Sequence, residues 1–132
     1  MSQIKVEYLG DLRTQSIHID SGHQIMTDAP KDNQGLGRKF SPTDMLASSL
    51  GSCLLTIMGI VAKRHEIDMT GSTANVKKSM SESPRRISSL VIDIHLNETF
   101  DKKNKSILRK AAEHCPVHNS LSEKIDITIN FN

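Results

Sequence analysis

The chain has 132 residues, enough for one domain with a substantial hydrophobic core. Its 17 basic and 15 acidic residues leave a net charge of +2, and it contains one Tyr, three Phe and no Trp. Nucleic-acid binders typically combine a basic field with stacking aromatic residues, so we expect no nucleic-acid partner. No repeat, low-complexity tract or linker divides the sequence, and we interpret residues 1–132 as a single domain.

The N-terminal third predicts strands followed by a loop. Residues 4–8 and 17–19 alternate apolar and polar side chains on either side of a Gly-Asp turn, which indicates a hairpin. Gln24 to Thr27 predicts a short third strand, and the glycines and proline within residues 28–39 predict a loop. The N-terminus lacks the apolar run of a signal peptide, so we expect a cytoplasmic protein in a reducing environment.

A long helix follows this loop. Ser41 is a suitable N-cap, Pro42 suits the first helical position, and Asp44 completes an S-x-x-D capping box. Apolar side chains then recur at three- and four-residue spacing, while small residues fill the other face. The sequence therefore predicts a helix from Pro42 to about Arg64 that is buried on several sides.

The segment from Met45 to Ala62 carries no charge, which also raises the alternative of a membrane span. Six of its residues are Ser, Thr or Gly, and both flanks are basic, so insertion and orientation would be poorly specified. We favour a soluble core helix and expect no membrane partner. One chain of this length makes too little sheet to cover such a helix, so burial predicts a homodimer.

The C-terminal half predicts two strands, a helix and a last strand. The first strand runs from Ile67 to about Ser81, and Ser83-Pro84 makes the turn into the second. A second helix starts at Thr99 or Asp101 and ends before Pro116. The core-facing positions of the later strands are Leu90, Ile92, Ile94 and Leu96, then Ile125, Ile127, Ile129 and Phe131. The fold class is therefore α+β, in the order β-β-(β)-α-β-β-α-β.

The two cysteines are the candidate reactive residues. Cys53 lies in the middle of the long helix, and Cys115 lies at the helix break, where Pro116 can also open a short helical turn with Cys115 as its N-cap. Each cysteine alone is typical of a small core residue. Both occupy core-facing helix positions, however, so the two helices can bring the sulfurs together. Cys115 and His118 have C-x-x-H spacing, which leaves a structural zinc site as an alternative, although Cys53 has no ligand near it in sequence.

Two motifs together resemble a known family. They are the Ser-Pro start of a small-residue-rich helix that leads to Gly51-Ser52-Cys53, and CPVHNSL from Cys115 to Leu121 before a closing Ile-x-Ile-x-Ile-x-Phe strand. In element order and in the separation of its cysteines, the chain resembles the OsmC/Ohr family of osmotically inducible and organic-hydroperoxide-resistance proteins. The resemblance is to an OsmC-like subgroup of that family.

The resemblance implies an intertwined homodimer whose long helices lie at its centre. It implies that Cys53 attacks an organic hydroperoxide as a thiolate and becomes a sulfenic acid, and that Cys115 condenses with it to a disulfide. A dithiol or other thiol reductant then restores both, and no cofactor is needed. The apolar neighbours of Cys53 favour an alkyl peroxide. The alternative is a non-catalytic module that binds a small molecule or senses redox state with the same pocket.

A thiolate at Cys53 needs a cation, because burial raises the pKa of a thiol and the helix dipole is weak so far from the helix start. Peroxidases of the family use an Arg held by a Glu directly after the Pro. Here that position is Thr43, and the acid is Asp44, which is more simply the capping residue. Arg38 and Arg13 are the candidate cations, and we favour Arg38 because it precedes the helix.

Overall fold

The structure is a computed structural model that describes residues 1–132. The chain forms two compact units, residues 1–45 and residues 46–132, and each is taken by itself. The interpretation of residues 1–132 as a single domain stays a prediction.

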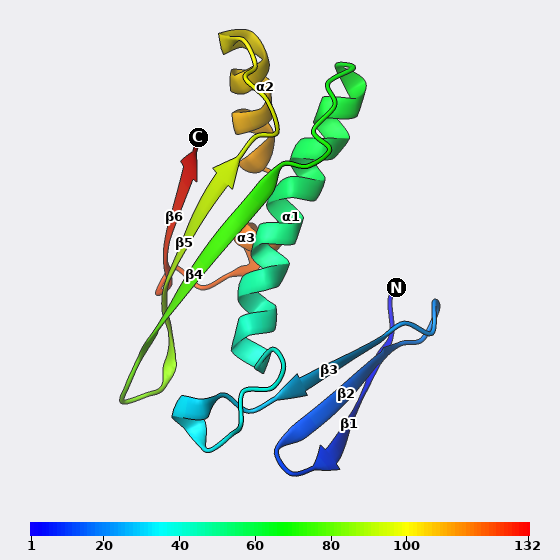
Figure 1. The fold of residues 1–132 in the computed structure, drawn as a ribbon, viewed down its shortest axis with the longest axis vertical. Helices are drawn as coiled ribbons and strands as arrows, with labels where there is room; N and C mark the ends of the chain where they lie inside the picture. The colour runs from blue at the N-terminus through cyan, green and yellow to red at the C-terminus, as the bar shows by residue number, and fades with distance from the viewer. The chain divides into compact units, whose positions relative to one another are not determined.

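The N-terminal unit contains a three-stranded antiparallel sheet. Its strands are β1 (Ile4–Gly10), β2 (Arg13–His18) and β3 (Gln24–Asp28), in that order across the sheet (Figure 1). The predicted hairpin and third strand are confirmed. Within the predicted loop, Lys31–Asn33 form a short 3-10 helix, η1. Three apolar residues of β1 share a face that is open to solvent in the single chain; they are Ile4, Val6 and Tyr8.

Helix α1 spans Pro42–Arg64, as predicted. The capping box forms in full: the Asp44 backbone N–H donates to Ser41 Oγ at 3.1 Å, and the Ser41 backbone N–H donates to Asp44 Oδ2 at 3.0 Å. These reciprocal bonds satisfy two donors that have no partner within the helix, which is why the helix begins at Pro42. Lys63 and Arg64 in its last turn suit the negative end of the helix dipole.

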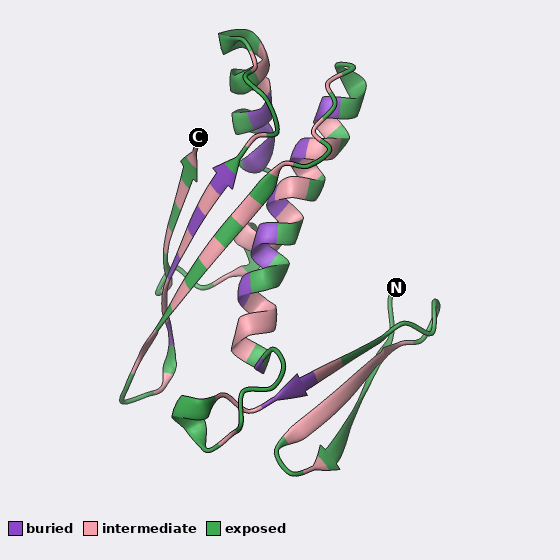
Figure 2. Ribbon diagram, in the orientation of Figure 1, coloured by how far each residue is buried: buried purple, intermediate pink, exposed green.

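Within the single chain, α1 buries one face rather than several (Figure 2). Its buried residues recur at three- and four-residue spacing: Ala47, Leu50, Gly51, Leu54, Met58 and Ala62. Gly51 is needed for this approach, since a Cβ there would lie 2.9 Å from Cγ2 of Val76 on the neighbouring sheet. By length and composition alone α1 is also apolar enough to cross a membrane, a test that the core helices of soluble proteins pass as well.

The C-terminal unit packs α1 on a second three-stranded sheet. Strands β4 (Thr73–Ser81) and β5 (Arg86–His95) form an antiparallel hairpin, and β6 (Asp126–Phe131) pairs with β5 in parallel, so β5 is central (Figure 1). A parallel pair needs a long crossover connection, and helices α2 (Lys102–Ala112) and α3 (Pro116–Ser120) provide it. The predicted α+β class and element order are confirmed, including the short helical turn after Cys115.

The strand predicted from Ile67 begins later, at Thr73. Local turn chemistry explains the difference. Glu66 has a positive φ of 57°, the Asp68 carboxylate accepts the Thr70 backbone N–H at 2.9 Å, and Gly71 has a φ of 94°. Such side-chain turns and left-handed residues interrupt an extended strand. Residues 65–72 therefore form the connection between α1 and β4.

One hydrophobic core joins the elements of this unit. The inward side of β5 supplies Leu90, Ile92 and Ile94, which are fully buried against α1 and α2. Helix α2 begins after Asp101, whose carboxylate accepts the Asn104 backbone N–H at 2.7 Å, and it presents Leu108 to the core. The two cysteine-bearing segments are thus anchored to the same core.

Candidate active site

Cys53 is the twelfth residue of α1 and is half-buried. It packs against the hydrophobic core, between the turns that carry the fully buried Leu50 and Leu54. The helix dipole acts mainly on the first and last turns, so it offers little stabilisation to a thiolate at this position. The helix supplies position and an apolar surrounding, and any cation must come from elsewhere.

Cys115 is the N-cap of α3 and is fully buried. Helix α2 ends at Ala112, the backbone of Cys115 is extended, and Pro116 occupies the first turn of the new helix. The Cys115 Sγ accepts the backbone N–H of His118 at 3.4 Å. This N-cap geometry was predicted from the Cys-Pro pair, and it points a backbone donor at the sulfur.

The structure brings the two cysteines together, as the placement of the helices predicted. Both are free thiols, and their side chains lie within hydrogen-bonding reach of each other. Burial raises the pKa of Cys115, and the hydrogen bond to Cys53 and the charge of an ionised Cys53 raise it further. The His118 N–H lowers this pKa in part. The raised pKa favours the protonated form of Cys115, and of the two cysteines only Cys53 is accessible to solvent.

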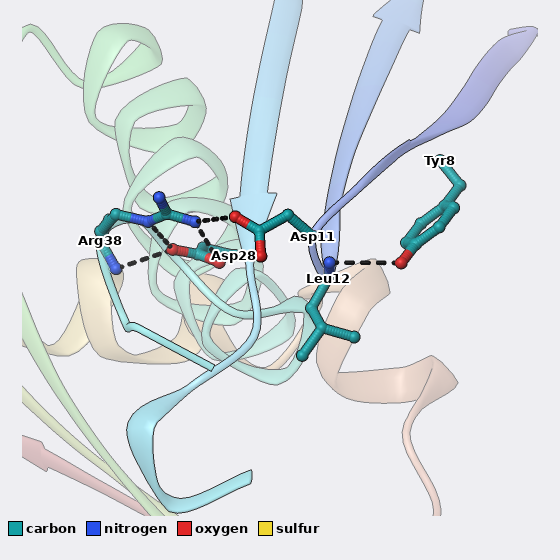
Figure 3. A network of polar contacts seen from close by, with 5 residues as sticks. All are labelled: Tyr8, Asp11, Leu12, Asp28 and Arg38. Atoms are coloured by element: carbon teal, nitrogen blue, oxygen red, sulfur yellow. Dashed lines mark hydrogen bonds and ion pairs between the residues drawn. The ribbon is translucent and has the colours of Figure 1, made fainter. Parts of the chain in front are cut away.

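Arg38 is bound to two carboxylates within the N-terminal unit (Figure 3). Its Nε donates to Asp28 Oδ2 at 2.7 Å, its backbone N–H donates to the same oxygen at 3.1 Å, and Nη2 lies 3.4 Å from Asp11 Oδ2. Asp28 is only 1% exposed. The backbone N–H of Asp28 also donates to the Phe40 carbonyl at 3.1 Å. Arg38 and Asp28 thus fasten the end of β3 to the loop that leads into α1.

Each partner of this ion pair stabilises the charge of the other. The hydrogen bond from Arg38 lowers the pKa of Asp28, against the effect of burial. The hydrogen bond from Asp28 raises the pKa of Arg38, and Asp11 adds to that effect. The assignment of Arg38 to the Cys53 thiolate stays a prediction, and the Arg38 charge is already shared between two carboxylates.

Arg13, the other candidate cation, is in a different situation. It lies half-buried at the start of β2, and its Nε is buried without a hydrogen-bond partner in the chain. Buried donors are normally paired, so an orphaned guanidinium nitrogen is unusual and costly. Of the two arginines, Arg13 has the unused hydrogen-bonding capacity.

Other residues weighed from the sequence also have places in the structure. Asp44 acts in the capping box, and the hydroxyls of Thr43 and Ser41 lie 3.2 Å apart. No group of three or more His, Cys, Asp or Glu side chains comes together in a way that could hold a metal ion. Sequence reasoning missed Asp28, because a single Asp at a strand end gives no signal until the partner loop is placed beside it.

Comparisons with known proteins identify the family to which the chain belongs. The sequence profile of the family described as OsmC-like protein matches residues 34–130. A solved structure from Psychrobacter arcticus 273-4, of a candidate osmotic stress induced and detoxification response protein, is similar at 48% identity. That match has a TM-score of 0.95 and covers 100% of this chain and 96% of that one. No curated protein matches the chain.

More distant structures share the fold. An OsmC like protein from Mycoplasma pneumoniae is 21% identical with a TM-score of 0.83, and the match covers 100% of this chain and 96% of that one. The organic hydroperoxide resistance protein OhrB of Bacillus subtilis is 15% identical with a TM-score of 0.68, and the match covers 100% of this chain and 98% of that one. With the profile match over most of the chain and the paired cysteines, the conclusion is direct: this chain belongs to the OsmC-like protein family.

Proposed function

We propose that this protein is a thiol-dependent peroxidase that reduces organic hydroperoxides, with Cys53 as the peroxidatic and Cys115 as the resolving cysteine. The observation that carries the proposal is the pair of free thiols whose side chains lie close enough to influence each other, one half-buried and one fully buried. Family membership supports it, since structures of the same fold include proteins named for organic hydroperoxide resistance.

The chemistry balances with these two thiols and an external reductant. The Cys53 thiolate attacks the terminal oxygen of ROOH, an S–O bond forms, the O–O bond breaks, and the alkoxide takes a proton to leave as ROH. Cys115 then gives up its proton and attacks the Cys53 sulfenic acid, so that an S–S bond forms and water leaves. A dithiol reductant returns both residues to thiols and becomes a disulfide itself. No cofactor takes part.

The surroundings of Cys53 favour an alkyl hydroperoxide over hydrogen peroxide. The sulfur packs against the apolar core, where the alkyl chain of a substrate loses unfavourable contact with water. Hydrogen peroxide gains nothing from such a surface and loses hydrogen bonds to water there. A substrate series of increasing alkyl length is expected to show rising kcat/KM, and a flat series would contradict this preference.

The thiolate-stabilising cation is proposed as Arg38, with Arg13 as its rival. Arg38 precedes α1 but is held by Asp28 and Asp11, whereas Arg13 has an unpaired Nε. Replacing each in turn by Gln, and measuring the thiolate fraction of Cys53 by ultraviolet absorbance against pH, separates them. The arginine that serves Cys53 is the one whose loss shifts that titration to higher pH.

A homodimer is proposed from the surface of mostly small residues that α1 leaves open in the single chain. The outward stripe of α1 is exposed along Ser49, Ser52, Thr56 and Ile60, and two of its hydroxyls bond back to helix carbonyls. Small residues with satisfied hydroxyls suit close packing of a second helix. Light scattering on the purified protein is expected to give twice the mass of one chain. In the source cell, the protein is expected in the cytoplasmic fraction.

The test of the function is peroxide consumption with a dithiol present. Cys53→Ser is expected to abolish consumption of cumene hydroperoxide, and the parent is expected to consume it over many turnovers. If both proteins consumed the peroxide equally, the enzyme proposal would be wrong. If neither did, and both thiols were inert to alkylation, the non-catalytic binding or redox-sensing module would be the better conclusion.

A further inference from the structure

The outward side of α2 concentrates positive charge. Five of its eleven residues are Lys or Arg and none is acidic, in a chain of net charge +2. At 100° per residue these cations fall within an arc of about 160°, and all are exposed, while the opposite side buries Leu108, Ala111 and Ala112. The five cations are Lys102, Lys103, Lys105, Arg109 and Lys110.

At its start, this arrangement works against the stability of the helix, although Arg109 and Lys110 in the last turn suit the dipole. Lys102 and Lys103 occupy the first turn, where the dipole favours negative charge. Lys105 and Arg109 are spaced by four residues, so they repel each other along the helix surface. A helix selected only for solubility would carry acids at its start. A local charge pattern that opposes the fold indicates that the charge serves another purpose.

Four of the cations are also unpaired. No ion pair within the chain involves Lys102, Lys103, Lys105 or Lys110, and we call these four lysines the α2 basic face. Arg109 is excluded from this definition because its guanidinium lies over the Phe131 ring, 5.2 Å from the ring centre. The flanking acids do not neutralise the face, since Asp101 is engaged as the N-cap and Glu113 is a single charge at the far end.

We propose that the α2 basic face is the docking surface for an acidic protein, namely the dithiol-bearing partner that reduces the Cys53–Cys115 disulfide. This inference rests on the proposed function. Helix α2 is about 16 Å long and only two residues separate its last turn, which carries Lys110, from Cys115, so a protein that binds along α2 also reaches the segment that carries Cys115. In the exchange the partner dithiol becomes a disulfide and its two protons pass to Cys53 and Cys115.

The chemistry of the face favours a protein over other anions. A helix that binds a lipid surface needs apolar side chains on its exposed side, but Ile107 is half-buried and Leu108 is fully buried in this one. A single-stranded nucleic acid needs exposed aromatic rings for stacking, and α2 contains none. A carboxylate-rich protein surface needs only complementary charge, which steers and speeds association.

Binding is tested with a fluorescein-labelled deca-glutamate peptide by fluorescence anisotropy. The matched variants carry Lys→Gln at the four positions of the α2 basic face, or at the exposed Lys5, Lys39, Lys63 and Lys77 as a control of equal net charge. Only the first variant is expected to lose affinity, by about tenfold at low salt. The proposal would be overturned if both variants lost affinity equally or if the parent did not bind the peptide. It would also be overturned if α2-dependent binding to anionic phosphatidylglycerol vesicles or to an oligonucleotide were tighter than binding to the peptide.

The redox arm uses the disulfide form of each protein and a Cys-x-x-Cys peptide flanked by glutamates or by glutamines. The parent and the control variant are expected to be reduced faster by the glutamate peptide than by the glutamine peptide. This difference in rate is expected to disappear at high salt. The α2 variant is expected to show no such advantage, yet to react with dithiothreitol like the parent. Equal advantages in all three overturn the docking proposal. Failure to form any Cys53–Cys115 disulfide instead overturns the proposed function, and leaves the peptide-binding result to judge the surface.

Discussion

The pair Arg38 and Asp28 and the pair Cys53 and Cys115 show two opposite uses of a buried contact. In the first, opposite charges are held 2.7 Å apart, and each stabilises the charged form of the other. In the second, two groups that can both become anions lie side by side, and ionisation of one opposes ionisation of the other. The first contact holds a loop in place, whereas the second keeps one thiol protonated beside a reactive neighbour.

The two pairs therefore depend on pH in opposite directions. The pKa of Asp28 is lowered on folding, so its contribution to stability is present at neutral pH and is lost as pH falls through that lowered pKa. The pKa of Cys115 is raised, so its contribution is present below the ordinary thiol pKa of 9.0 and is lost as pH rises above it. Acid weakens the N-terminal unit, and alkali weakens the cysteine site.

The largest expected effect comes from breaking the cysteine pair. Cys115→Ser is expected to leave one turnover per site and then to stop, because the Cys53 sulfenic acid has no thiol to capture it and oxidises further. Mass spectrometry of Cys53 after peroxide treatment checks this, with the parent as control. Steady turnover by the variant without sulfinic acid would show that Cys115 is not the resolving residue.

The cysteine site also depends on how closely α1 approaches β4. Gly51→Ala would place a methyl group 2.9 Å from the stiff Val76 side chain, at a cost of about 1–3 kcal/mol in overpacking. Gly59→Ala meets nothing within 4 Å and is expected to gain about 0.5–1 kcal/mol from helix propensity. Urea unfolding of both variants measures the contrast.

Val76→Ala removes the side chain that a methyl group at position 51 would meet. Adding Gly51→Ala to the Val76→Ala protein is therefore expected to cost less stability than adding it to the parent. If Gly51→Ala were as stable as the parent, the close packing of α1 on β4 would be contradicted. If Gly59→Ala were destabilised only in the dimer, a second copy would be packed against that side of α1.

The ion pair is tested by Asp28→Asn. The variant is expected to unfold at a lower temperature at neutral pH, and to exchange the amide hydrogens of residues 24–40 faster, because the Arg38 guanidinium loses its charged partner. As the pH falls through the lowered pKa of Asp28, the difference from the parent is expected to shrink, since the parent carboxylate is then protonated as well. A difference that stayed constant over this range would show that the charge of Asp28 is unimportant.

The smallest effect is the titration of Cys115 itself. In Cys53→Ser the pKa of Cys115 is expected to fall towards its ordinary value, because the charge of Cys53 is gone, although burial still holds it up. Ultraviolet absorbance against pH, with the double Cys variant as a blank, records the shift. An unchanged titration would mean that the two thiols do not influence each other.

Sequence reasoning succeeded where local chemistry decides the structure. The capping residues set the start of α1 at Pro42, and the Cys-Pro pair set Cys115 as an N-cap, because both signals act within one helical turn. The meeting of the two thiols followed from their core-facing positions. Sequence reasoning failed where a turn competes with a strand pattern, at residues 67–72. It also failed where the two partners of a contact come from distant segments, as with Asp28 and Arg38.

The exposed apolar side of β1 was equally beyond local reasoning. Ile4, Val6 and Tyr8 alternate as a core-facing strand would, yet each is more than 60% exposed in the single chain. Alternation identifies a face that needs cover but does not say which molecule provides it. The same limit applies to α1, whose pattern predicted burial on several sides while one chain covers one side.

The complete burial of Cys115 dictates the direction of attack in any later thiol exchange. While that sulfur remains covered, an incoming thiol can only collide with Cys53, so Cys115 departs as the leaving group and the mixed disulfide with the reductant forms on α1. A protein that lacks Cys115 cannot form that internal disulfide, so a reductant thiol would reach Cys53 only in competition with further oxidation of its sulfenic acid.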